Sequence, residues 1–239
     1  MLYSKNANVY MAARSQAKAD GAIKEIKALA PSSTGSLTFL ALDLNDLSTI
    51  KSSASYFLAR EKRLDVLFNN AGVMSIANLT RTAQGHETNM GVNCLGTFLF
   101  TELLTPVLAQ TAKTAPAGTV RVVWVSSSAA EFYGVKNSGV DLSDLDCKAE
   151  KPGMARYGQS KAGNYLHAVE YARRHKAEGI VSIPLNPGNL DSGLWQEHGT
   201  VARFVIKSML YPVVYGAYTL IYAGLSPGLD TEKSDSWSK

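Results

Sequence analysis

Short apolar runs alternate along the chain with longer stretches in which apolar residues recur every three or four positions. The apolar runs predict β-strands at 8–13, 37–42, 66–69, 120–126 and 180–185. The longer stretches predict helices at 15–30, 47–63, 91–109 and 155–176. Strands that alternate with helices are typical of a parallel sheet covered by helices on both faces. We therefore predict an α/β fold with a doubly wound parallel sheet, in which ligands bind at the carboxyl ends of the strands.

The composition supports one domain and excludes several classes of function. The 239 residues are 46% hydrophobic, enough to bury a core, and no repeat or low-complexity tract marks a second domain, so residues 1–239 form a single predicted domain. The formal charge of +4 is scattered, and the one compact basic group, Arg173, Arg174 and Lys176, fits a solvated helix face. We expect no nucleic-acid partner. The two cysteines and four histidines are isolated, so we expect neither a disulfide scaffold nor a metal site.

The most specific chemical signal is Tyr157 followed four residues later by Lys161, within a predicted helix. Residues four apart on a helix share a face, so the two side chains lie within reach of each other. A phenol normally titrates near pH ~10, and a nearby ammonium lowers that pKa and makes the tyrosine a usable general acid or base. Ser127, placed opposite, would hold a carbonyl or alcohol oxygen, and Asn93 would fix a water that returns the proton. An ordinary surface helix is the alternative interpretation of the spacing.

Further motifs stand in order around this pair: Asn69-Asn70-Ala71-Gly72, then Asn93, then Ser126-Ser127-Ser128 after a strand, and finally Asn186-Pro187-Gly188. The series resembles the short-chain dehydrogenase/reductase family, and closely its retinol-dehydrogenase-like branch, which has fungal members. The resemblance covers essentially the whole chain and implies a Rossmann-like fold. In the family's pattern Tyr157 would be the catalytic acid/base, while Lys161 would tune its pKa and hold the nicotinamide ribose. Ser127 would orient the substrate oxygen, and Asn93 would relay the proton.

The resemblance also implies a nicotinamide dinucleotide cofactor. Arg14 ends the first predicted strand, near the place where enzymes that use NAD tend to carry an acidic residue and where an arginine suits the 2′-phosphate of NADP. We therefore expect NADP(H) rather than NAD, with a solvent-facing arginine as the alternative. In the family's pattern Asp43 and Leu44 would contact the adenine and Asn69 the adenosine half, although Asp43 also fits the start of a helix. The other expected cofactor contacts lie in two loops: Ala71, Gly72, Pro187, Gly188 and Ser192.

One part of the family's pattern is missing from this sequence. The family opens with a strand and a Gly-rich loop that lets the backbone approach the pyrophosphate at a helix N-terminus. None of the 19 glycines stands in a G-x-G-x-x-G spacing. We therefore expect an N-terminally truncated fold, in which the strands at 8–13 and 66–69 lack the strand between them and leave two backbone edges unpaired. Three explanations stay open: a true start upstream of Met1, a shortened inactive relative, or a gap closed by rearrangement or by another subunit.

The stretch 201–225 is strongly apolar and rich in tyrosine. Its length approaches that of a membrane span, but Lys207, Pro212 and the tyrosines argue against one. We interpret it as the wall of a lipophilic pocket, with shallow membrane attachment or contact with a second subunit as alternatives. Such a pocket suits a bulky hydrophobic alcohol, ketone or aldehyde. The sequence thus predicts a cytoplasmic NADP(H)-dependent oxidoreductase that interconverts a hydrophobic carbonyl compound and its alcohol. The alternative is a catalytically inactive relative that acts as a binding or assembly module.

Overall fold

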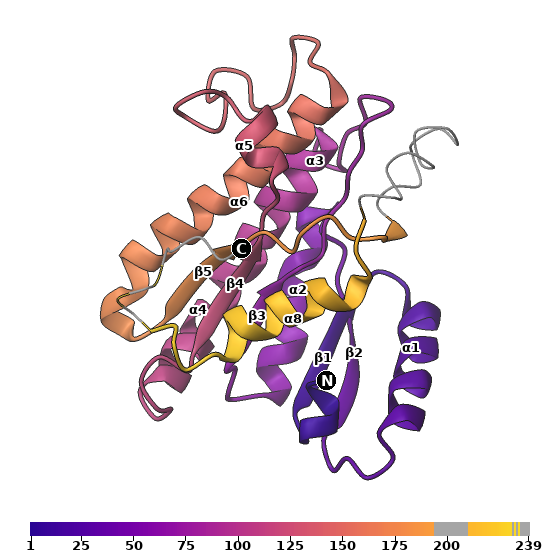
Figure 1. The fold of residues 1–239 in the computed structure, drawn as a ribbon, viewed down its shortest axis with the longest axis vertical. Helices are drawn as coiled ribbons and strands as arrows, with labels where there is room; N and C mark the ends of the chain where they lie inside the picture. Colours follow the sequence, from indigo (N-terminus) through magenta and orange to yellow (C-terminus); the bar gives the residue numbers. More distant parts are fainter. Residues whose placement is uncertain (194–209, 231, 233, 235–239) are drawn as a thin grey trace.

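The computed structural model describes residues 1–193, 210–230, 232 and 234 (Figure 1). Strands and helices alternate along the described chain, which confirms the predicted α/β class. The strands are β1 (Asn8–Ala13), β2 (Ser36–Ala41), β3 (Val66–Asn69), β4 (Arg121–Val125) and β5 (Val181–Leu185). The longer helices are α1 (Gln16–Leu29), α2 (Leu47–Arg60), α4 (Thr97–Ala112), α6 (Gly153–His175) and α8 (Val213–Leu225). The short elements are η1 (Tyr3–Lys5), α3 (Thr88–Met90), η2 (Gly91–Gly96), α5 (Ala129–Tyr133) and η3 (Lys176–Glu178).

The predicted elements agree with the structure in order and type, and differ by a few residues at their ends. Helices α1 and α2 begin where side chains cap them: Ser15 and Asp46 each accept a hydrogen bond from a backbone N–H of the first turn. Helix α2 ends at Arg60, three residues before its predicted end. The helix predicted at 91–109 belongs to a longer apolar segment, α3–η2–α4, whose middle part η2 is a π-helical turn.

The sheet is divided into two parallel ladders. Strand β1 pairs with β2, and β3, β4 and β5 pair in that order. Figure 1 shows β1, rather than β2, on the side toward β3. Among the described residues β1 and β3 therefore each have a strand partner on one side only, as expected for strands that lack a common neighbour. The consequence is a row of backbone groups without ladder partners on each of these strands.

One hydrophobic core joins the two ladders. Ile50 of α2 and Leu104 of α4 belong to the same buried cluster as Leu40 of β2 and Trp124 of β4. This helical layer holds the ladders together, although no strand pairing among the described residues connects them. On the other face of the sheet, Ala223 of α8 packs in a second cluster with side chains of β4 and β5.

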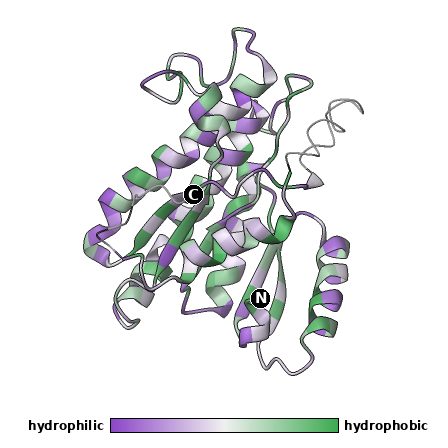
Figure 2. Cartoon of the chain, viewed as in Figure 1, coloured by the Kyte–Doolittle hydropathy of each residue, from purple (hydrophilic) through white to green (hydrophobic). Residues whose placement is uncertain are grey.

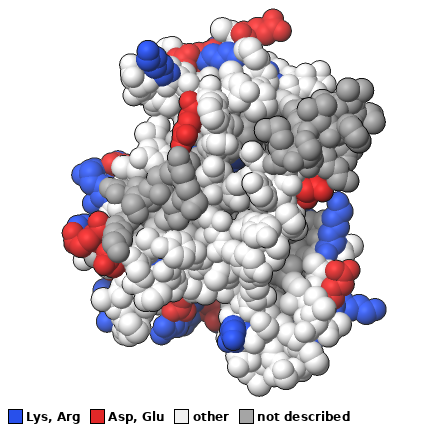
Figure 3. Space-filling model, viewed as in Figure 1, with Lys and Arg blue, Asp and Glu red and all other residues white. Residues whose placement is uncertain are grey.

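Strand β4 is the most protected part of the sheet, because all five of its residues are buried and it has a strand on each side. Figure 2 shows that β4 and β5 are largely hydrophobic. Helix α8, whose Ala223 packs against side chains of both strands, contains no charged residue. In Figure 3 the charged side chains lie mainly around the rim of this face, and its centre is uncharged.

One segment of the described chain, Thr88–Ala112, is long and apolar enough to cross a membrane by length and composition. Of its apolar window, 61% is buried inside the protein, and the core helix of a soluble protein passes the same test. Helix α8 is apolar but has only 13 residues. The part of the predicted apolar stretch that covers 201–209 lies outside the described residues.

The divided sheet predicts that backbone amides of β1 exchange with deuterium faster than those of β4. Strand β1 is partly exposed and paired on one side, whereas β4 is fully buried and paired on both sides. Exposed backbone groups open at a lower free energy than core groups. Hydrogen–deuterium exchange of peptides that cover the two strands measures the difference. Strand β5 is buried but paired on one side, so its exchange rate separates the effect of burial on amide exchange from the effect of strand pairing. Equal protection of β1 and β4 would contradict the division.

Candidate active site

The carboxyl end of β4 fixes the position of Lys161. The Val125 carbonyl, at the last residue of β4, accepts hydrogen bonds from Lys161 Nζ at 2.9 Å and from Asn164 Nδ2 at 3.1 Å. Ser126 Oγ donates to the Lys161 carbonyl at 2.6 Å. These three hydrogen bonds fasten α6 to the end of the strand. They place the lysine side chain beside Tyr157, one helical turn earlier on α6.

Burial shifts both members of the Tyr157–Lys161 pair toward their neutral forms. Desolvation lowers the pKa of Lys161 to about 8. Desolvation also raises the pKa of Tyr157, while a hydrogen bond with Ser127 acts in the opposite direction. The ammonium nitrogen lies 5.8 Å from the centroid of the Tyr157 ring. The predicted net lowering of the Tyr157 pKa is therefore wrong for this structure, because desolvation of the phenol outweighs the effect of Ser127. The contribution of the Lys161 charge to this pKa stays a prediction.

Asn93 joins the loop after β3 to α6. It lies in the π-helical turn η2, and such turns are frequent at functional sites. Its Oδ1 accepts from Val73 N at 2.8 Å, and its Nδ2 donates to the Val73 carbonyl at 3.0 Å and to Ser160 Oγ at 2.9 Å. A Cβ at Gly72 would lie 2.9 Å from Asn93 Oδ1, so a glycine is needed for this close approach. Asn93 thus positions the loop, and its role as a proton relay stays a prediction.

A cavity of about 790 Å³, the Tyr157 cavity, brings most of the predicted site residues together. Ser127, Tyr157 and Lys161 line it. Five of the predicted cofactor contacts line it as well: Ala71, Gly72, Pro187, Gly188 and Ser192. Gly188 has a φ of +86°, a left-handed conformation that favours glycine, and a Cβ at this position would meet open space.

Helix α8 forms one wall of the Tyr157 cavity, but with small and aliphatic side chains. Val213, Gly216, Ala217 and Leu220 line the cavity. The tyrosines expected in this wall do not line it and are more than half exposed: Tyr211, Tyr215, Tyr218 and Tyr222. The prediction is wrong for these tyrosines. On α8, which has 3.6 residues per turn, the lining residues fall on a different side from Tyr215, Tyr218 and Tyr222. Tyr211 precedes the helix.

Four large side chains of the Tyr157 cavity were not among the predicted site residues. Met74 lies in the loop after β3, Phe132 and Tyr133 end α5, and Met154 is the second residue of α6. The sequence contains a signal that could have identified Phe132 and Tyr133, since these two adjacent aromatic residues follow Ser127 by five and six positions. The two methionines stand in no local pattern that indicates a cavity.

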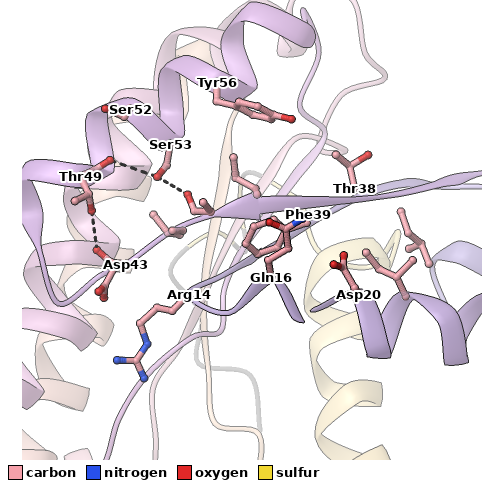
Figure 4. A pocket seen from close by; sticks show the side chains of 15 residues that line it. Arg14, Gln16, Asp20, Thr38, Phe39, Asp43, Thr49, Ser52, Ser53 and Tyr56 are labelled. Atoms are coloured by element: carbon pink, nitrogen blue, oxygen red, sulfur yellow. Dashed lines mark hydrogen bonds between the residues drawn. The ribbon is translucent and has the colours of Figure 1, made fainter. Parts of the chain in front are cut away.

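Arg14 and Asp43 line a second cavity of about 890 Å³, the Arg14 cavity (Figure 4). It runs along β2 between α1 and α2. Figure 4 shows Arg14 and Asp43 at the same end of the cavity. Asp43 Oδ1 accepts a hydrogen bond from the backbone N–H of Asn45 at 2.9 Å. The guanidinium of Arg14 has no ion-pair partner among the described residues, so it is free to bind an anion.

Two predicted cofactor contacts face the protein interior instead of either cavity. Leu44 is a member of the main hydrophobic core. Asn69 is buried, and its Nδ2 donates to Thr101 Oγ1 of α4 at 2.8 Å. Both side chains are thus engaged in packing, and the structure does not bring them together with Arg14 or with Tyr157.

The thiols and histidines supply no metal centre in the described part of the chain. No group of three or more His, Cys, Asp or Glu side chains is placed there to bind a metal ion. Cys94 is fully buried, which raises the pKa of its thiol to about 12, and its Sγ donates to the Ser160 carbonyl at 2.8 Å. Its contacts are those of a core side chain.

The chain is similar to known proteins along its whole length. A family model described as short chain dehydrogenase matches residues 1–201. A short-chain dehydrogenase/reductase of Phomopsis amygdali is 50% identical, over 99% of this chain and 72% of the relative. One of Phaeosphaeria nodorum is 49% identical, over 100% of this chain and 77% of the relative.

Solved structures show the same fold. An NADPH-bound carbonyl reductase from chicken fatty liver has a TM-score of 0.70 at 17% identity, over 96% of this chain and 84% of that chain. The NADP active-site complex of RhlG from Pseudomonas aeruginosa has a TM-score of 0.70 at 21% identity, over 94% of this chain and 82% of that chain. The family model and the relatives show that the chain belongs to the short-chain dehydrogenase/reductase family of Rossmann-like oxidoreductases, which act on CH–OH and C=O groups with NAD(P).

Proposed function

We propose that the protein is an NADP(H)-dependent oxidoreductase of the retinol-dehydrogenase-like branch, which interconverts a hydrophobic carbonyl compound and its alcohol. The observation that carries the proposal is the group formed by Ser127, Tyr157 and Lys161 on one cavity. The side chains of Ser127 and Tyr157 line the same cavity, and the amine of Lys161 lies over the tyrosine ring, 5.8 Å from its centroid. Apolar and small side chains make up much of the remaining wall, which suits a hydrophobic substrate.

The two hydroxyls are arranged to hold and protonate a carbonyl oxygen. The raised pKa keeps the Tyr157 phenol protonated near neutral pH, so it is a proton donor to an oxygen that also accepts from Ser127. The bound cofactor would supply the hydride to the carbonyl carbon. Proton transfer leaves a phenolate on Tyr157, which the positive charge of Lys161 would stabilise. For alcohol oxidation the same groups act in the reverse direction.

The residues of the two cavities fit the two ends of an NADP molecule. Lys161 and Tyr157 would hold the nicotinamide ribose, and the free guanidinium of Arg14 suits the 2′-phosphate as a charged, bidentate donor. The similar structures of carbonyl reductase and RhlG hold NADPH and NADP, which supports the same preference here. The sequence has no G-x-G-x-x-G spacing for the pyrophosphate, so cofactor binding is the first step to measure.

Replacing Tyr157 by phenylalanine should lower kcat for carbonyl reduction roughly 10²–10⁴-fold, the usual contribution of a general acid. The ring stays in place, so the affinity for NADPH should change little. Rates of NADPH consumption and calorimetric titrations of NADPH measure the two effects. Tyr165→Phe, two turns further along α6, is the matched control and should keep the wild-type rate. A Tyr157→Phe protein with substantial turnover would contradict the proposal, and a folded wild-type protein that binds no cofactor would favour the inactive-module alternative.

Replacing Lys161 by methionine should abolish turnover and yet stabilise the fold near neutral pH. The folded state holds the ammonium at a pKa of about 8, well below the ordinary value of 10.5, so its burial costs about 3 kcal/mol. The Val125 carbonyl keeps Asn164 Nδ2 as a donor in the variant.

The sign of the pH dependence is fixed by the lowered pKa of Lys161. Between pH 8 and 10.5 the unfolded chain binds more protons than the folded one, so the wild type gains stability there and the advantage of Lys161→Met shrinks. Urea unfolding of both proteins at pH 7 and at higher pH measures this. If Lys161→Met is less stable than the wild type at pH 7, the buried ammonium does not destabilise the folded state as proposed.

Replacing Arg14 by alanine should weaken NADPH binding about 10- to 100-fold, the value of charged hydrogen bonds to one phosphate. NADH lacks the 2′-phosphate, so its affinity should stay within a small factor. Calorimetric titration with each cofactor gives both values. Lys18→Ala removes an exposed charge from α1 that does not line the Arg14 cavity, and should leave both affinities unchanged. An equal loss for NADPH and NADH would show that Arg14 does not select the phosphate.

A further inference from the structure

The Tyr157 cavity is lined by an exposed aromatic ring that the proposed proton transfer does not use. Phe132, in α5, is 76% exposed and lines the cavity, and Tyr133 beside it lines the cavity as well. Large apolar side chains that stay in water next to a cavity mark ligand-binding surfaces more often than isolated apolar residues do. This ring is therefore a candidate to contact the substrate.

The position of α5 relative to the reacting groups is fixed by close packing. A Cβ at Gly158 would lie 2.6 Å from the Ala129 carbonyl oxygen and 2.6 Å from Tyr133 Cβ. Because Gly158 directly follows Tyr157, α5 lies directly against the helix that carries the proposed acid. The start of α5 is also tied to Ser127, whose Oγ accepts from Ala129 N at 3.1 Å. The backbone of α5, which carries Phe132, thus has a defined place relative to the two hydroxyls.

The chemistry of the lining indicates which substrates fit beside this ring. Among the described residues that line the cavity, Lys161 is the one charged group, and no Asp, Glu, Arg or His lines it. Lys161 already donates to the Val125 carbonyl. An anionic substrate would therefore meet no free counter-charge among the described lining residues. Met74 and Met154 also line the cavity, and thioethers make favourable contacts with aromatic rings.

We propose that Phe132 determines specificity, and that the substrates are neutral carbonyl compounds or alcohols that carry an aromatic ring, which stacks on Phe132 while the oxygen meets Ser127 and Tyr157. The inference rests on the proposed function and names its substrate class. Phe132 contributes to substrate binding and not to proton transfer, because its ring is separate from the groups that transfer the proton.

Two ketones of similar size and different aromaticity test this: 2-acetylnaphthalene and its saturated analogue 2-acetyldecalin. Phe132→Ala should raise KM for 2-acetylnaphthalene roughly three- to tenfold with little change in kcat, as expected from loss of an aromatic pair. The KM for 2-acetyldecalin should change less. Phe132→Leu keeps an apolar side chain but loses the π-face, and should also lose the preference, whereas Phe132→Tyr should retain it.

Leu142→Ala is the control, since Leu142 is 78% exposed on a neighbouring loop and does not line the cavity. It should leave both KM values unchanged. Equal effects of Phe132→Ala on the two ketones, or an effect on kcat alone, would overturn the inference.

The inference and the proposed function fail in different ways. If the folded wild type reduces neither ketone, the proposed function loses support, and calorimetric binding of 2-acetylnaphthalene then decides the inference. Binding that is weaker in Phe132→Ala and Phe132→Leu than in the wild type and Phe132→Tyr supports it. The absence of binding to the wild type, or equal binding to all four proteins, overturns it. Circular dichroism of each variant shows whether the fold is kept.

Discussion

The candidate site depends on one backbone carbonyl, that of Val125 at the end of β4. A buried ammonium is unfavourable unless a polar group accepts its hydrogen bonds. Val125 provides that group for Lys161, at 2.9 Å, and Asn164 shares the same oxygen. Because β4 is the most protected strand, the acceptor is held rigidly. The place of Lys161, and of Tyr157 one turn earlier, therefore follows from the end of a core strand.

The two cavities belong to different ladders of the divided sheet. The Tyr157 cavity is built around the end of β4, whereas the Arg14 cavity lies along β2. Side-chain packing of α2 and α4 in a common core connects the two ladders. The relative position of the cavities thus depends on packing between layers and not on backbone pairing. A dinucleotide bound to both would bridge the ladders and stabilise their arrangement, since a ligand that binds only the folded state raises its stability.

Several features of the Tyr157 cavity lower the stability of the folded protein when no ligand is bound. Lys161 is charged in the interior, and Phe132 exposes most of its ring to water. Such features are common where function needs them and where the surrounding structure is stable enough to hold them. Here the holding contacts are close: Gly158 packs against α5, and Gly72 packs against Asn93. A Cβ at Gly158 would lie 2.6 Å from α5, and a Cβ at Gly72 would lie 2.9 Å from Asn93 Oδ1, so both positions are too close to their neighbours for a side chain.

The sequence by itself determined the order and type of the elements and the pairing of Tyr157 with Lys161, because hydrophobic periodicity and a spacing of four on a helix are local properties. Only the tertiary structure decided which side chains face a cavity. Asn93 and Asn69 turn to partners from distant segments, and Phe132 reaches the Tyr157 cavity through packing of α5 on α6. The direction of the Tyr157 pKa shift was decided in the same way, since desolvation depends on everything packed around the phenol.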